Sequence, residues 1–240
     1  MQSLSGKRIV LLGASSGLGL GTAQAAAAEG ARVVIVSSNQ TRIDEALRTL
    51  PAGSEGHAID LSKEENFKTL FTGLGHFDHL VYTAAENLNL TLVSDTDIQK
   101  AHDFFTLRFW GALTAVKYAA PHINPGGSIN LTGGTAGARP GKGWALASAI
   151  CGAMEGLVRA LAVELAPIRV NAVIPGVIKT NLWNGLSEAD REGLYKSYSE
   201  KLLVGRVGEA EDIALAFLYL MKQTYGSGQN IVVDGGGVLV

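Results

Sequence analysis

The stretch that decides the fold is RIVLLGASSGLGLGTAQAAAAEG, which runs from Arg8 to Gly30. It begins with an apolar run, continues through a turn with glycines at Gly13, Gly17 and Gly19, and ends in an alanine-rich segment. This order predicts a strand, a tight turn and a helix. In that setting backbone N–H groups and the helix N-terminus can approach a pyrophosphate. We therefore expect the turn to bind a dinucleotide, and a merely structural tight turn is the alternative.

The rest of the chain repeats this alternation of short β-branched runs and longer helical patterns. Apolar strands separated by helices predict a three-layer, doubly wound parallel α/β sheet of about seven strands, the Rossmann fold. We expect a single domain over residues 1–240, with a substrate lid near residues 181–205. In such a sheet, ligands bind at the carboxyl ends of the strands. The expected strands are Arg8–Leu12, Arg32–Val36, His57–Asp60, His79–Thr83, Ser128–Thr132, Arg169–Ile174 and Asn230–Val233, and the expected helices include Gly17–Glu29, Thr41–Leu50, Asp95–Ala120, Leu146–Leu165 and Glu209–Lys222.

Composition narrows the class of partner. The chain has 20 Lys and Arg against 22 Asp and Glu, without a block of like charge, so we expect no nucleic-acid or anionic-membrane partner. A small molecule or a protein partner is favoured. The single cysteine, Cys151, allows no intrachain disulfide, which agrees with a cytoplasmic location. The uncharged stretch Ile9–Ala28 is interrupted by glycines, which favours the strand, turn and helix over a signal peptide or a membrane span. We expect no bound metal.

Four segments share one resemblance. They are GASSGLG (Gly13–Gly19), Asp60–Leu61, RVNAVIPGVIKT (Arg169–Thr180) and GSGQNIVVDGG (Gly226–Gly236). Together they are similar to the classical short-chain dehydrogenase/reductase superfamily, over essentially the whole chain. The resemblance implies a nicotinamide dinucleotide, with the aspartate at the adenine and the third segment lining the nicotinamide and its phosphates. With the polar residues at the end of the second expected strand, the expected cofactor-binding residues are Gly13, Ser15, Ser16, Gly17, Leu18, Gly19, Ser37, Ser38, Asn39, Arg42, Asp60, Leu61, Thr83, Ala84, Ala85, Pro175, Gly176, Ile178 and Thr180.

The end of the second expected strand bears on the choice of cofactor. An acidic residue there binds the ribose 2′-hydroxyl of NAD and repels the 2′-phosphate of NADP. This chain instead has Ser37, Ser38 and Asn39, with Arg42 one turn later. Short polar groups can donate to a phosphate, so NADP(H) is favoured over NAD(H). The alternative is that the serines only cap the next helix, and the second-strand arginine usual in NADP-preferring relatives is missing.

The resemblance also implies a catalytic tetrad of Asn, Ser, Tyr and Lys. In this family the lysine holds the nicotinamide ribose and lowers the pKa of the tyrosine toward neutrality. Aligned on the family frame, the four positions are occupied by Arg108, Gly134, Ala147 and Cys151 in this chain. No tyrosine occurs between residues 126 and 166, so a shift of register does not restore the pair. Ordinary carbonyl reduction by the family mechanism is therefore not expected.

Other side chains could substitute for the tetrad. Tyr82 lies at an expected strand end, and Arg108 could polarise a carbonyl, bind an anion or form a buried pair. For Tyr82 packing is the ordinary alternative. Near Cys151 the sequence offers no His or Lys to activate the thiol, so we expect it to be a small apolar group. Glu86, Lys142, Tyr195 and Tyr198 are further candidates to reach a ligand.

These observations leave three hypotheses. The first is a catalytically degenerate, NADP-binding relative that acts as a sensor, a scaffold or a silent subunit. The second is an NADP-dependent oxidoreductase that acts on a small carbonyl or alcohol through non-classical residues such as Tyr82 and Arg108. The third is a lyase or isomerase that uses the fold without hydride transfer. The resemblance implies a homodimer or homotetramer, and Ser148, Gly152 and Gly156 would line one helix face for close approach.

Overall fold

The protein is described by a computed structural model covering residues 2–88 and 90–240. Seven parallel strands form one sheet in the order β3-β2-β1-β4-β5-β6-β7. The order reverses between β1 and β4, which is where doubly wound sheets bind ligands. This confirms the predicted seven-stranded Rossmann-type fold. The strands are β1 (Arg8–Leu12), β2 (Arg32–Ser37), β3 (Glu55–Ala58), β4 (Phe77–Tyr82), β5 (Ile123–Thr132), β6 (Arg169–Pro175) and β7 (Asn230–Val233).

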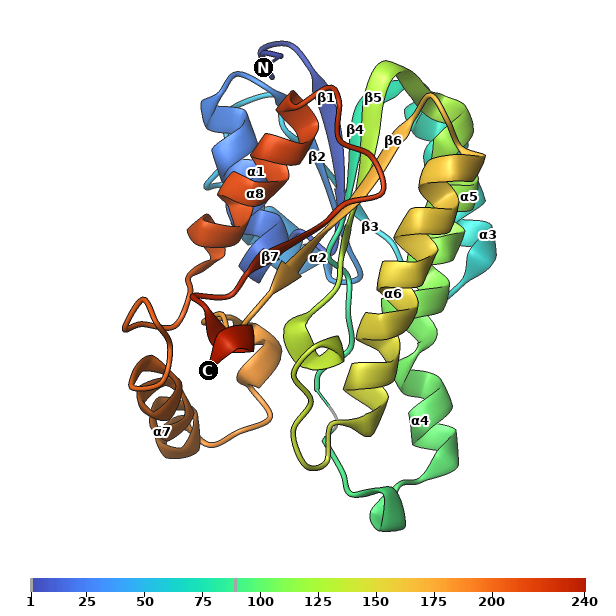
Figure 1. Cartoon of the computed structure of the whole chain (residues 1–240). Helices are drawn as coiled ribbons and strands as arrows, with labels where there is room; N and C mark the ends of the chain where they lie inside the picture. The colour runs from blue at the N-terminus through green and yellow to red at the C-terminus, as the bar shows by residue number, and fades with distance from the viewer. Residues whose placement is uncertain (1, 89) are drawn as a thin grey trace.

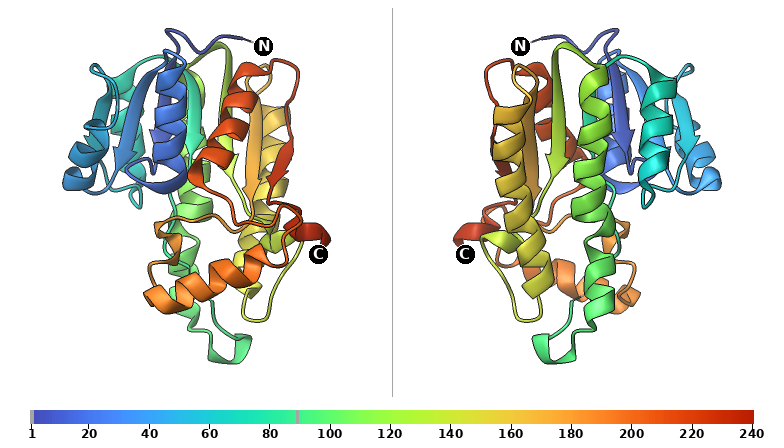
Figure 2. Two further views of the ribbon diagram at one scale, coloured as in Figure 1. Left: turned by 90° about the vertical axis from the view of Figure 1, so that its left-hand side faces the viewer. Right: turned by 90° about the vertical axis from the view of Figure 1, so that its right-hand side faces the viewer.

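Helices cover both faces of the sheet (Figures 1 and 2). Three of them, α1, α2 and α8, pack on one face, and α3, α5 and α6 pack on the other. The remaining two, α4 and α7, lie beyond the carboxyl ends of the strands, below the sheet in Figure 1. The bounds are α1 (Gly17–Ala28), α2 (Gln40–Leu47), α3 (Glu64–Leu74), α4 (Ile98–Phe104), α5 (Ala112–Ala119), α6 (Ala145–Glu164), α7 (Glu188–Ser199) and α8 (Ala210–Lys222).

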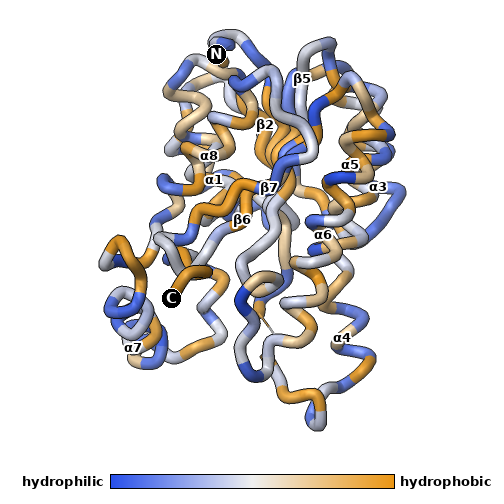
Figure 3. Tube along the Cα trace, in the orientation of Figure 1, coloured by the Kyte–Doolittle hydropathy of each residue, from blue (hydrophilic) through white to orange (hydrophobic). Residues whose placement is uncertain are grey.

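Two apolar layers stabilise this sandwich. Alternate residues of β1 point to opposite faces, so Ile9 and Leu11 pack with α1 and α8, whereas Val10 and Leu12 pack with α3, α5 and α6. Figure 3 shows the central strands as the most apolar part of the trace. All four side chains are fully buried, and at about 25 cal/mol per Å² their burial is a main source of stability.

Two sequence predictions need correction. The expected strand His57–Asp60 begins two residues earlier, because β2 pairs Val34 with Glu55 and Ser37 with Ala58. The expected single helix Asp95–Ala120 is interrupted: α4 ends at Phe104, and α5 begins only at Ala112. Between them lies a π-helical turn, η2 (Thr106–Gly111), in which Trp110 N donates to Phe105 O at 3.1 Å. Such turns are rare and are frequent at functional sites.

The helix α6 has an apolar and small-residue composition throughout. It is the one described helix that is long and apolar enough to cross a membrane by length and composition alone. Its Ala147, Ile150 and Met154 are instead buried in the core. On its exposed side, Gly152 and Gly156 have open space where a Cβ would stand. The association of this face with another subunit stays a prediction.

The segment expected to form a lid, residues 181–205, lies beyond the carboxyl ends of the strands (Figure 1). It contains α7, which the sequence patterns did not predict as a helix, and Ser187 caps α7 by accepting from Asp190 N at 3.2 Å. Tyr195 of α7 forms a small buried cluster with Trp183, Leu202 and Val207. This segment is therefore a packed unit with its own apolar core, and its role as a substrate lid stays a prediction.

A buried histidine links the central strands. His79 of β4 is 1% exposed, and its Nδ1 lies 2.9 Å from Ser128 Oγ of β5. Burial lowers the pKa of His79 to about 4 from an ordinary 6.5, and Arg169 adds to this effect. The ring is therefore neutral in the folded protein at pH 7.

We expect His79 to reduce stability in mild acid. Below pH 6.5 the unfolded chain protonates this ring while the folded protein does not, so the free energy of unfolding falls until pH reaches about 4. A shift from 6.5 to about 4 corresponds to about 3 kcal/mol. Urea unfolding across this range should show a smaller loss for His79→Asn. The exposed His76 is the control: an equal effect from His76→Asn would contradict the assignment.

Candidate functional site

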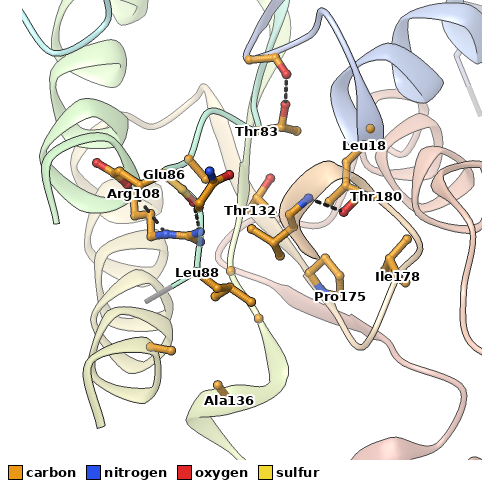
Figure 4. Close-up of a pocket in the computed structure, with 18 of the residues that line it drawn as sticks. Leu18, Thr83, Glu86, Leu88, Arg108, Thr132, Ala136, Pro175, Ile178 and Thr180 are labelled. Carbon is orange, nitrogen blue, oxygen red and sulfur yellow. Dashed lines mark hydrogen bonds and ion pairs between the residues drawn. The ribbon is translucent and has the colours of Figure 1, made fainter. Parts of the chain in front are cut away.

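A cavity of about 940 Å³ opens at the carboxyl ends of the strands. It is lined by the residues that follow β1, β2, β3, β4, β5 and β6, together with the lid and the start of α6. The structure brings to this one cavity all the residues implied to bind cofactor except Asn39. Figure 4 shows the cavity between the Glu86 and Arg108 side and the side formed by Pro175, Ile178 and Thr180.

The glycine turn is tightly packed against the end of β4. A Cβ on Gly13 would stand 2.5 Å from Ala84 Cα, and the backbone of Gly13 has a φ of +84°. A Cβ on Gly19 would stand 2.6 Å from Thr83 Oγ1. Both contacts are closer than real Cβ atoms permit, so only glycine allows this approach. The turn therefore leaves a backbone-lined cradle at the N-terminus of α1, which suits a pyrophosphate.

Polar groups gather at the end of β2. Ser37 Oγ accepts from Ser15 Oγ at 2.8 Å, which joins this site to the glycine turn. Ser38 and Arg42 also line the cavity, and both are exposed. Asn39 does not line it, because its side chain caps α2 by accepting from Arg42 N at 2.9 Å. The helix cap is thus supplied by the asparagine, and Ser37 and Ser38 both line the cavity.

Asp60 lies at the same end of the cavity. Its carboxylate accepts from the hydroxyl and the backbone N–H of Ser62 at 2.7 Å and 3.0 Å. These hydrogen bonds lower the pKa of Asp60, so it is charged at neutral pH. The strand expected at His57–Asp60 begins two residues earlier in the structure, but Asp60 still follows β3 closely.

The wall facing the middle of the cavity consists of small groups. Ala147 and Cys151 lie one turn apart on α6, and both line the cavity. A Cβ on Gly134 would stand 3.1 Å from Cys151 Sγ, which places all three side by side. Burial raises the pKa of the Cys151 thiol, although backbone N–H groups of Gly137 and Ala136 and the charge of Arg108 oppose the shift. The thiol is therefore protonated at neutral pH and is a weak nucleophile.

Near this wall, on the turn η2 that contacts α6, Arg108 is paired with Glu86. Arg108 Nε lies 3.7 Å from Glu86 Oε2, and Arg108 Nη2 donates to the backbone oxygen of Glu86. The Arg108 guanidinium also lies over the ring of Phe104, 4.8 Å from its centre. Burial lowers the pKa of Arg108, but an arginine remains charged at neutral pH. The structure therefore gives this charged residue a partner, and both side chains line the cavity.

Tyr82 and Glu86 together hold the π-helical turn. The hydroxyl of Tyr82 donates to Leu107 O at 2.6 Å, and Glu86 Oε1 accepts from Leu107 N at 2.5 Å. Burial raises the pKa of the Tyr82 hydroxyl, and the nearby Glu86 adds to the rise. Tyr82 is only 2% exposed. The Tyr82 hydroxyl, a candidate substitute acid from the sequence, therefore already donates its hydrogen bond to a backbone carbonyl.

Several lining residues were not predicted from the sequence. Among them are Leu88, Trp144 and Trp183, together with Gly237 and Val240 of the C-terminal turn. No sequence motif marks Trp144 and Trp183, and only their positions on the cavity wall identify them as site residues. Of the further candidates, Tyr198 lines the cavity, whereas Tyr195 is buried in the lid cluster and Lys142 does not line the cavity. Within residues 2–88 and 90–240 no group of His, Cys, Asp and Glu is placed to hold a metal ion.

The chain closely resembles known proteins in sequence and in structure. Residues 13–237 match a family model described as enoyl-(acyl carrier protein) reductase. A short-chain dehydrogenase/reductase of Stachybotrys chlorohalonatus is 35% identical over 255 residues, which cover 100% of both chains. One of Gibberella fujikuroi is 31% identical over 257 residues, which cover 100% of this chain and 97% of the other.

Solved structures agree with these matches. A small-chain dehydrogenase in complex with NADPH superposes with a TM-score of 0.87 at 35% identity, over 98% of this chain and 100% of the other. MalC from Malbranchea aurantiaca, described as a reductase/Diels–Alderase, has a TM-score of 0.91 at 29% identity, over 99% and 98% of the two chains. The match extends from the glycine turn to the C-terminal strand, and this chain therefore belongs to the short-chain dehydrogenase/reductase family.

Proposed function

We propose that this chain binds NADP(H) in the cavity and does not act as an ordinary carbonyl reductase. Three features of the cavity support binding: the glycine cradle, the charged Asp60, and the Ser37, Ser38 and Arg42 group at the end of β2. The related NADPH complex supports the same cofactor. The glycine turn would hold the pyrophosphate, the serines and Arg42 the 2′-phosphate, and Thr180 with Pro175 the nicotinamide end. When bound, the nicotinamide ring supplies or accepts a hydride.

The wall formed by Gly134, Ala147 and Cys151 supports the second part of the proposal, that the protein is not an ordinary carbonyl reductase. Hydride transfer to a carbonyl needs a group that gives its oxygen a proton, and a positioned acid–base contributes about 10²- to 10⁴-fold in rate. Ala147 and Gly134 hold no proton to give, and the partly buried Cys151 lacks the charge of a lysine. Tyr82 is bonded to Leu107 O and does not replace the missing acid. We infer that a bound dinucleotide has no classical route to a carbonyl substrate here.

The choice of NADP over NAD has its own test. We expect Ser37→Asp to weaken NADPH binding about 10-fold or more, because a carboxylate there repels the 2′-phosphate and binds a free ribose hydroxyl instead. NADH binding should be unchanged or stronger. Titration of each nucleotide, followed by its fluorescence, gives the two dissociation constants.

The matched control for this test is Asn87→Asp. Asn87 is exposed and lines the same cavity on the side of Glu86, so its substitution adds the same charge at a different place. Equal losses in the two variants would indicate general repulsion and not a phosphate site at Ser37. If the unmodified protein binds neither nucleotide, the proposed function is wrong. If it binds NADH more tightly than NADPH, the NADP preference is wrong.

A second candidate is supported by MalC, whose description includes a Diels–Alderase. A ring closure of that class forms carbon–carbon bonds without a proton donor, so the small-residue wall would not impair it. The dinucleotide would then be part of the cavity wall. Conversion of a ligand without loss of nicotinamide absorbance would favour this candidate over every reductase.

A further inference from the structure

The backbone of Leu107 is held at its N–H and at its C=O by two side chains, those of Tyr82 at the end of β4 and of Glu86 in the loop that follows. Its N–H donates to Glu86 Oε1 at 2.5 Å, and its C=O accepts from the Tyr82 hydroxyl at 2.6 Å. Gly111 leaves the room for that hydroxyl, because a Cβ there would collide with it. These two hydrogen bonds stabilise the wider π-helical turn η2, which lies between α4 and α5 (Figure 1). The turn sets the direction in which Arg108 leaves the helix.

Held in this way, Arg108 faces the cavity with part of its donor capacity unused. Nη2 donates to the Glu86 backbone oxygen, and Nε stands 3.7 Å from the Glu86 carboxylate. Among residues 2–88 and 90–240, no hydrogen bond uses Nη1. The side chain is 18% exposed and lines the cavity, where Figure 4 shows it beside Glu86 and above Leu88. An oxygen atom of a ligand can therefore take the free donor.

The surroundings of Arg108 limit what that ligand can be. The adjacent cavity wall is mostly apolar and is formed by Leu88, Phe104, Leu107, Trp144, Ala147 and Ile150. Glu86, whose side chain is 24% exposed, already neutralises Arg108. The negative charge of Glu86 would repel a carboxylate on the ligand at this partly desolvated position, whereas it would not repel a neutral oxygen. Arg139 and Lys201 also line the cavity, but both are exposed, so water screens their charge.

We infer that Arg108 is the residue that recognises the ligand, and that it selects a neutral carbonyl oxygen on an apolar ligand. Tyr82 and Glu86 are positioning residues, since they act through Leu107 and Arg108. This inference rests on the proposed function, because the ligand stands beside the dinucleotide in the same cavity.

Three bicyclic probes test the inference on protein saturated with NADP⁺, which cannot donate a hydride. They are 1-tetralone, which carries a neutral carbonyl, 1-naphthoate, which carries a carboxylate, and tetralin, which carries no oxygen. We expect 1-tetralone to bind about tenfold or more tightly than tetralin, the usual effect of one hydrogen bond from a charged donor. Naphthoate should bind more weakly than tetralone. Isothermal calorimetry measures all three.

Two variants separate recognition from packing. Arg108→Leu should weaken tetralone binding about tenfold and leave tetralin unchanged, because tetralin has no oxygen atom that the lost donor could have bound. Glu86→Gln keeps an oxygen for Leu107 N but removes the charge, so naphthoate should gain about tenfold while tetralone changes by less than about threefold. Glu188→Gln on the exposed start of α7 removes the same charge away from the cavity and should change neither. Thermal unfolding checks that each variant is folded.

The outcomes distinguish this inference from the proposed function. Equal binding of tetralone and naphthoate by the unmodified protein, no loss in Arg108→Leu, or no binding of any probe would overturn it. A naphthoate gain in Glu188→Gln as large as in Glu86→Gln would also overturn it. If NADP⁺ itself does not bind, the proposed function fails, and the same titrations on the cofactor-free protein still test Arg108.

Discussion

We expect the Gly13→Ala variant to lose about 2–5 kcal/mol of unfolding free energy and most of its affinity for NADPH. The positive φ of Gly13, +84°, costs an alanine about 1–2 kcal/mol. The added Cβ would also stand 2.5 Å from Ala84 Cα, which is backbone and cannot rotate away. The turn and the end of β4 must then separate, and the cradle opens. Urea unfolding and NADPH titration measure the two effects.

Gly53 provides the matched control for this prediction. Its φ is +92°, but a Cβ there would have nothing within 4 Å. Gly53→Ala should therefore show only the conformational cost of about 1–2 kcal/mol, with unchanged NADPH binding. The difference between the two variants isolates the contact with Ala84. Equal losses of stability in both would show that the turn tolerates a side chain and that its close packing is not required.

Restoring the family tetrad should create a carbonyl reductase. The variant combines Arg108→Asn, Gly134→Ser, Ala147→Tyr and Cys151→Lys, all of which line the cavity. The new lysine should lower the pKa of the new tyrosine from about 10 toward neutrality, so that it can donate a proton to a substrate oxygen. We expect NADPH-dependent reduction of 1-tetralone or benzaldehyde to rise about 10²- to 10⁴-fold above the unmodified protein. The loss of nicotinamide absorbance measures the rate.

A control variant carries Ala147→Phe in place of Ala147→Tyr. Phenylalanine fills the same space without a hydroxyl, so its rate should stay near that of the unmodified protein. A gain in the phenylalanine variant would mean that packing, and not proton transfer, had been restored. If the tyrosine variant folds and binds NADPH but gains nothing, the four positions do not form the family's catalytic frame.

The cofactor half of the site could be predicted from the sequence because parallel strands fix its geometry. Residues after β1, β2, β3, β4 and β6 meet at one edge of the sheet wherever each strand begins. For this reason Asp60 reached the cavity although the start of β3 was misplaced by two residues. The glycine turn was equally predictable, since its approach to Ala84 requires residues without a Cβ.

The ligand half could not be predicted because distant side chains shape it. The break between α4 and α5 depends on Tyr82 and Glu86, which lie more than twenty residues before Leu107. No local pattern in the segment Asp95–Ala120 reports those contacts. The same holds for the partner of Arg108, which the sequence left open between an anion and a buried pair. The structure shows the pair with Glu86.

The most direct test of the account is a single-turnover assay on the unmodified protein saturated with NADPH. The protein is mixed with a panel of aldehydes and ketones that includes 1-tetralone, and nicotinamide absorbance is followed. We predict saturable NADPH binding, with no loss of absorbance above that of NADPH and substrate without protein. Oxidation of the bound NADPH at an ordinary enzymatic rate, about 1–10³ s⁻¹, would contradict it.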